Sequence, residues 1–127
     1  MMFVDYNFDE QKGKNISLGH VGDFGFMSIL FDCTEFFDDI DDEKENKTAN
    51  VAVNFPDGSY AELPLEVVGN VVTWEIDDVV TEIDGFGEFQ LKVSDGTMQK
   101  CYPVCGYCIE KSITEPVTEQ VTEPTGE

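Results

Sequence analysis

The sequence predicts an all-β domain, an immunoglobulin-like antiparallel β-sandwich of about seven to nine strands with a disordered C-terminal tail. Short apolar–polar alternations recur along the chain, turn residues separate them about every 8 to 12 residues, and no segment keeps the period of a helix. The 127 residues are 41% hydrophobic and include ten Phe, which is enough for one aromatic-rich core. We therefore assign residues 1–111 to one β-sandwich domain and residues 112–127 to a Thr/Glu/Pro-rich linker or tail.

The N-terminal third contains three candidate strands. Residues 3–8 and 14–18 show short alternations, and residues 22–31 are apolar on both faces, which is typical of a central strand buried on both sides. Residues 32–47 interrupt this pattern with eight acids and two Lys. A short helix around residues 34–45 is the one helical candidate, although no apolar stripe sustains it.

The middle of the chain contains four further strand candidates separated by turn residues. Pro-Asp-Gly at 56–58 and Gly-Asn at 69–70 are turn signals, because Gly permits a positive φ and Pro presets its own. Pro64 marks an edge strand or a bulge. Residues 79–83 fit a strand or a turn. The four candidates are residues 50–55, 60–68, 71–76 and 88–93.

The C-terminal part is expected to hold a last strand region and then a tail. Residues 98–109 alternate but are broken at Pro103 and Gly106. From residue 112 onward, Thr-Glu-Pro occurs at 114–116 and again at 122–124. Such a segment buries too little apolar surface to offset its ordering entropy, so an extended linker is expected.

The charge balance excludes two classes of partner. Twenty-seven acids face seven Lys, and the net charge is −20. Binding to nucleic acid or to an anionic membrane requires a basic surface, which this composition cannot build. A partner is expected to be basic, cation-bridged or apolar; alternatively, the charge serves only solubility. The first residues lack a basic start and a long apolar run, so we expect synthesis in the cytoplasm without a signal peptide.

Four cysteines form the first candidate site. Cys33, Cys101, Cys105 and Cys108 are the right number for tetrahedral zinc, but their spacing does not form two C-x-x-C pairs. In a reducing compartment free thiols are the default, so we interpret them as small apolar side chains, with zinc or a disulfide as the alternative.

The acidic loop is the second candidate site. Asp38, Asp39, Asp41 and Asp42 offer oxygens to a cation, but the glycine turn and the Glu spacing of an EF-hand loop are missing. A solvated loop is the preferred interpretation. His20, the only His, has no base-and-orienter pattern around it. We therefore expect no catalytic residue, no cofactor and no resident metal.

The order of the motifs resembles a known family. Gly-Asp at 22–23 leads a long apolar strand, a strand runs into Pro-Asp-Gly, and a hairpin with Val-Thr-Trp at 72–74 follows. Then come Gly-x-Gly-x-x-Gln at 85–90, Ser-Asp-Gly at 94–96, and a last strand that runs into Lys-Ser-Ile and the acidic linker. Over roughly residues 14–115 the chain resembles the N-terminal domain of baseplate upper proteins and tail-fibre proteins from phages and prophages of Gram-positive bacteria.

The resemblance implies a virion structural protein and not an enzyme. In that family the domain is a β-sandwich that anchors a longer protein to the baseplate, so other tail proteins are the expected partners, homo-oligomers are expected in a tail ring, and the expected location is the virion. The aromatic side chains expected to dock a neighbour are Tyr60, Phe86 and Tyr102. The alternative is a carbohydrate- or receptor-binding module of a cell-surface protein.

Overall fold

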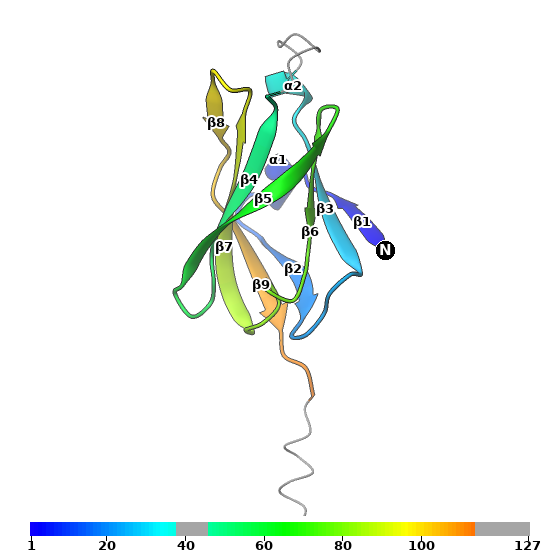
Figure 1. Ribbon diagram of the computed structural model, residues 1–127. Coiled ribbons are helices and arrows are strands. Elements are labelled where there is room, and N and C mark those ends of the chain that lie inside the picture. The colour runs from blue at the N-terminus through cyan, green and yellow to red at the C-terminus, as the bar shows by residue number, and fades with distance from the viewer. Residues whose placement is uncertain (38–45, 114–127) are drawn as a thin grey trace, which may run out of the picture.

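The computed structural model describes residues 1–37 and 46–113 of the chain. Within these residues the fold is mostly β, as the sequence predicts, with nine strands in one curled sheet and two short helices beside it (Figure 1). The strands are β1 (Met2–Asp5), β2 (Asn15–His20), β3 (Met27–Asp32), β4 (Thr48–Asn54), β5 (Tyr60–Val68), β6 (Val71–Glu75), β7 (Gly85–Ser94), β8 (Gln99–Cys101) and β9 (Cys105–Glu110). The helices are α1 (Phe8–Gln11) and α2 (Thr34–Phe37).

The sheet is mixed, which corrects the expectation of a purely antiparallel arrangement. Its order is β1-β3-β6-β5-β4-β7-β9-β2, with β8 paired to β7. The neighbours are antiparallel except at the two ends, where β1 runs parallel to β3 and β2 runs parallel to β9. The cause is the connection through α1, which carries the chain from one end of the sheet to the other and thereby replaces a hairpin between β1 and β2.

The strand β5 joins the two halves of the sheet. Residues 60–65 pair with β4, whereas residues 66–68 pair with β6. The sheet bends along β5, and the buried residues of both halves form one hydrophobic cluster. Alternation along the strands directs the core side chains inward. Val51 and Val53 of β4 are fully buried, while Asn54, the last residue of the strand, is exposed.

Aromatic rings fill the centre of this core. Phe89 of β7 packs against Trp74 with ring centroids 5.1 Å apart and against Tyr6 at 5.6 Å. Phe31 and Tyr107 complete the contacts of this ring at 6.2 and 6.5 Å. Edge-to-face and tilted geometries of this kind add to the roughly 2–3 kcal/mol that burial of one such ring contributes.

Two predicted strands are shorter than the alternation suggests. The strand predicted over residues 22–31 begins only at Met27, because Gly22 and Gly25 have φ of +93° and +75° and hold the preceding residues in a loop. The strand predicted over residues 3–8 ends at Asp5. Asn7 then caps α1, since its side-chain oxygen accepts hydrogen bonds from two backbone N–H groups of the first turn.

The remaining predictions fall partly outside the described residues. Residues 79–83, which fit a strand or a turn, form a turn that buries Val80 and Thr81. Of the helix predicted around residues 34–45, α2 supplies the first four residues, and the rest lies outside the described residues. Most of the predicted tail, from residue 114, also lies outside them.

Candidate functional site

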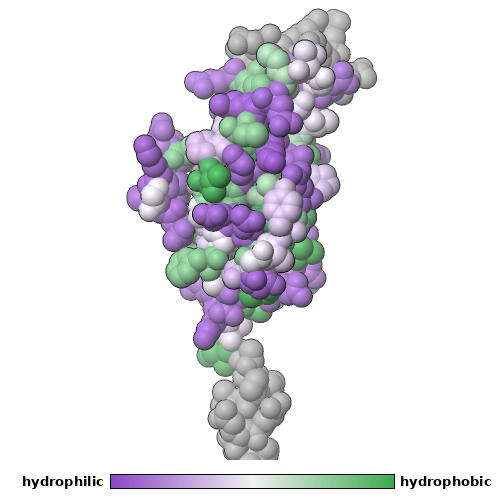
Figure 2. All heavy atoms as spheres, turned by 90° about the vertical axis from the view of Figure 1, so that its left-hand side faces the viewer, coloured by the Kyte–Doolittle hydropathy of each residue, from purple (hydrophilic) through white to green (hydrophobic). Residues whose placement is uncertain are grey.

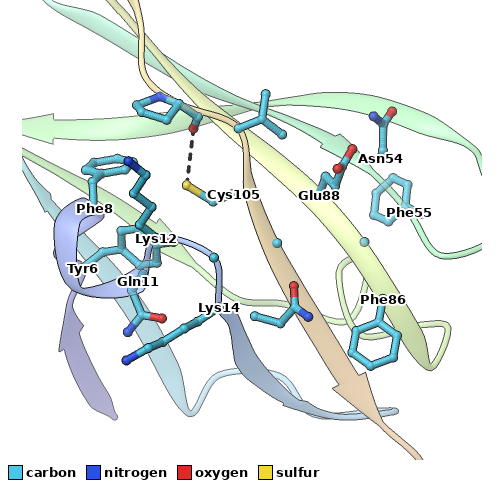
Figure 3. Close-up of a pocket in the computed structure, with 16 residues that line it drawn as sticks. Tyr6, Phe8, Gln11, Lys12, Lys14, Asn54, Phe55, Phe86, Glu88 and Cys105 are labelled. Carbon is cyan, nitrogen blue, oxygen red and sulfur yellow. Dashed lines mark hydrogen bonds between the residues drawn. The ribbon is translucent and has the colours of Figure 1, made fainter.

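A groove with a volume of 620 Å³ crosses β7 and the start of β9 (Figure 3). One wall is the segment between α1 and β2, and the other is the end of β4. We call it the outer groove. It is lined by Tyr6, Phe8, Gln11, Lys12, Gly13, Lys14, Asn15, Asn54, Phe55, Phe86, Gly87, Glu88, Pro103, Val104, Cys105 and Gly106.

Two of the glycines that line the groove lie within strands and have close neighbours. A Cβ on Gly106 would collide with the side chain of Asn15, which lies across this glycine. A Cβ on Gly87 would lie 2.5 Å from the ring of Tyr107 and 2.6 Å from the backbone oxygen of Asn54. Neither position requires a positive φ, so close approach of neighbouring groups explains both glycines.

A row of polar positions runs across five strands of this face. Tyr60, Asn54, Glu88, Gly106 and Asn15 are successive cross-strand partners on β5, β4, β7, β9 and β2. Cross-strand partners direct their side chains to the same face, so amide, carboxylate and phenol groups share one platform, and the side chain of Asn15 covers the glycine.

Exposed aromatic and apolar side chains flank this row. Phe86 lies two residues before Glu88 on β7 and is 70% exposed. Tyr60, which ends the row on β5, is 58% exposed. Val104 borders both the outer groove and a smaller hollow beside Tyr60. Elsewhere the surface is mixed: on the side presented in Figure 2, hydrophobic residues form small patches among hydrophilic ones.

The charges of the groove differ from those of the chain as a whole. Lys12 and Lys14 lie on one wall, although the chain has only seven Lys against 27 acids. Glu88 lies on β7, across the groove from these two lysines (Figure 3). At the β5 end of the face, hydrogen bonds from Tyr60 and Lys92 lower the pKa of Glu62, and the Lys92–Glu62 ion pair measures 3.3 Å.

The thiol within the groove is not activated. Cys105 donates a hydrogen bond to the backbone oxygen of Pro103 at 3.3 Å (Figure 3), and burial raises the pKa of its thiol. Burial and the neighbouring Cys105 also raise the pKa of Tyr6. A thiol with a raised pKa stays protonated at neutral pH and is a poor nucleophile.

The structure keeps the four predicted cysteines apart. Cys33 is buried at the end of β3, Cys101 is exposed on β8, Cys105 faces inward at the start of β9, and Cys108 lies on the outer face of that strand. All four are free thiols. Within residues 1–37 and 46–113, no three His, Cys, Asp or Glu side chains are placed to hold a metal ion. The candidate cation loop of Asp38, Asp39, Asp41 and Asp42 lies outside the described residues.

The other singled-out residues have separate environments. His20 lies at the end of β2 between Asp23 and Glu110, at 3.9 and 3.8 Å, and the hydroxyl of Ser17 donates to Glu110 instead of facing the imidazole. Of the three predicted docking aromatics, Tyr60 and Phe86 lie on the outer face. Tyr102 is half-buried and stacks on Phe8 instead, with ring centroids 5.1 Å apart.

Sequence reasoning missed Lys12, Lys14 and Asn15, because they reach the groove only through the α1 crossover. The one local signal was the presence of Gly87 and Gly106 within strand-like segments, which indicates close backbone approach. No protein-family model matches the chain, and no curated protein matches it. Among the described residues, no helix has the length and apolar character needed to cross a membrane.

Proposed function

We propose that this chain is a structural assembly module of a phage tail or baseplate that docks other virion proteins through its outer groove. The observation that carries the proposal is the pairing of two exposed aromatic side chains, Phe86 and Tyr60, with a polar groove on a sheet. Exposed aromatic residues among hydrogen-bonding groups are typical of protein interfaces. The order of sequence motifs supports the virion context.

The proposal includes an immunoglobulin-like sandwich. In that fold strands A-B-E-D form one sheet and strands C-F-G form the other. The observed order supports this arrangement if β1, β3 and β6 act as A, B and E, and if β4, β7 and β9 act as C, F and G. The strand β5 then takes the place of D through its second half, and β2 is an additional strand beside G.

The test is incorporation into tail particles. Tail particles are purified by density-gradient centrifugation from the strain that produces the chain, and the chain is quantified in each fraction. We expect the wild-type chain in the tail fraction and a severalfold lower share for Phe86→Ser, because an exposed interface aromatic often contributes about 2 kcal/mol or more. Recovery of the wild-type chain only outside the tail fraction would refute the proposal.

The matched control is Phe24→Ser. Phe24 is also 70% exposed but lies in the loop between β2 and β3, away from the outer groove. It should enter tail particles like the wild type. Equal losses for Phe24→Ser and Phe86→Ser would show that reduced surface hydrophobicity, and not the outer groove, governs incorporation.

A carbohydrate-binding role is the second candidate. The observation that favours it is the exposed ring of Phe86 near the amide of Asn54 and the carboxylate of Glu88 (Figure 3). A sugar ring packs its C–H face on an aromatic ring and pairs its hydroxyls with such groups. A glycan array probed with the wild type and Phe86→Ser tests this role, and binding lost in the variant would support it.

A further inference from the structure

The hairpin of β5 and β6 opens after three residue pairs, the last of which joins Glu66 to Thr73. Beyond that pair β5 follows β4 while β6 stays beside β3, so the two strands diverge (Figure 1). Residues 60–64 of β5 therefore have β4 on one side and no strand on the other side among the described residues. This segment is an open strand edge within the sheet.

The direction of the backbone groups on this edge follows from the hairpin. Val68 closes the two-residue turn and directs its N–H and C=O toward β6. Because alternate residues of an antiparallel strand bond to the same neighbour, Tyr60 and Glu62 direct their N–H and C=O to the open side. Pro64 has the same orientation and has no N–H to leave unpaired. The edge thus offers the donors and acceptors that an added strand requires.

A groove with a volume of 390 Å³ lies beside the C-terminal end of this edge, where β5 and β6 begin to diverge. It is lined by Leu63, Pro64, Leu65, Glu66, Thr73, Trp74, Glu75 and Asp77. Among the lining residues, Leu63 and Leu65 are half-buried and Trp74 is buried. The only charged side chains that line the groove are acidic. An apolar floor with an acidic rim accommodates a strand whose side chains alternate between apolar and basic.

The indole of Trp74 supplies an independent observation. Trp74 lines the groove and is only 1% exposed, and its Nε1–H has no hydrogen-bond partner among the described residues. An unpaired buried donor costs roughly 1–3 kcal/mol. Because Trp74 lines the groove, an occupant of the groove changes the surroundings of the indole and therefore its fluorescence.

The charge of the rim selects the occupant. Glu66, Glu75 and Asp77 line the groove, and no Lys does. A second copy of this chain, at a net charge of −20, is repelled. A basic strand is attracted.

We propose that the open edge of β5 is a strand-acceptor site, to which an extended basic segment of a partner protein adds by β-augmentation. The added strand pairs its backbone with Tyr60 and Glu62, and its Lys or Arg side chains meet the acidic rim. The site uses the backbone of Tyr60, whose ring belongs to the outer face, but none of the residues that line the outer groove, and it does not depend on the virion role.

The probe is a synthetic peptide of about seven residues that alternates Lys and Val, which matches the length of an ordinary strand. Its binding is followed by the fluorescence of Trp74, the only Trp of the chain. We expect a saturable shift of the emission. The same peptide with every backbone amide N-methylated keeps its charge but has no N–H to pair with the edge, and should bind at least about tenfold more weakly. Equal binding of both peptides would overturn the proposal.

Matched charge reversals locate the site. Glu66→Lys combined with Glu75→Lys removes the rim charge at two exposed positions, and should weaken binding of the Lys–Val peptide about tenfold or more. The control combines Asp9→Lys with Glu10→Lys on the exposed face of α1, which changes the net charge equally, and should bind within about twofold of the wild type. A rim variant that binds as well as the control would overturn the proposal, as would an unchanged Trp74 emission.

Discussion

Replacing Tyr107 with Phe removes a hydroxyl that the fold buries without a hydrogen bond. Tyr107 is 0% exposed, and its hydroxyl has no hydrogen-bond partner among the described residues. Burial, and secondarily the charge of Asp57, raises the pKa of this phenol from 10.0 to about 12. The folded protein therefore holds the phenolic proton in a pH range where the unfolded chain releases it.

The sign and size of the effect follow from this difference in pKa. Between pH 10 and 12 the unfolded chain binds fewer protons than the folded one, so the free energy of unfolding falls as the pH rises. The contribution of Tyr107 is fully present below pH 10 and is lost as the pH passes about 12. A shift from 10 to 12 corresponds to a loss of about 1.4 kcal/mol at pH 11 relative to pH 7.

The assay is urea unfolding at pH 7, 9 and 11, followed by circular dichroism. At pH 7 the Tyr107→Phe variant should be at least as stable as the wild type, because a buried unpaired group is removed. At pH 11 the stability difference in favour of the variant should widen by about 1.4 kcal/mol. Tyr60→Phe, at an exposed position, is the control and should change the pH dependence less. Parallel losses of stability in the wild type and Tyr107→Phe would refute the reasoning.

Three further substitutions or reactions test the packing. Gly87→Ala forces a Cβ against the ring of Tyr107 and should cost about 1–3 kcal/mol by thermal unfolding; an unchanged Tm would contradict the contact. Phe89→Ala empties the centre of the aromatic core and should cost about 3–5 kcal/mol by urea unfolding, so a loss below 1 kcal/mol would argue against that core. With a thiol reagent, exposed Cys101 should react in the native protein and Cys33, whose thiol pKa is raised by burial, only after unfolding; early labelling of Cys33 would contradict its burial.

The strands in the middle of the chain could be predicted because their signals are local. Residues 50–55, 60–68, 71–76 and 88–93 lie within or nearly coincide with β4 to β7, where period-two alternation meets recognisable turn residues. The parallel ends of the sheet could not be predicted in this way. Pairing between β2 and β9 depends on where α1 carries the chain, and no local pattern encodes that path.

The candidate site was also predictable only where the signal is local. Residue type alone predicted Phe86, Tyr60 and Tyr102 as docking side chains; the first two are exposed, whereas Tyr102 stacks on Phe8. Burial depends on which strands become neighbours, and residue type does not contain that information. The open edge of β5 likewise appears only once the register of the hairpin is known, although Pro64 signalled an edge strand.

The parallel pairing of β2 with β9 sets an order of events during folding. Ser17 and Glu110, whose side chains are hydrogen-bonded, lie 93 residues apart in the chain. A chain emerging from the ribosome can form the hairpins from β4 to β7 while its first 20 residues still lack the strand that β2 pairs with. Only when β9 has been made can β2 pair, and only then is the wall of the outer groove complete. The outer groove can therefore form only after β9 has been synthesised and has paired with β2.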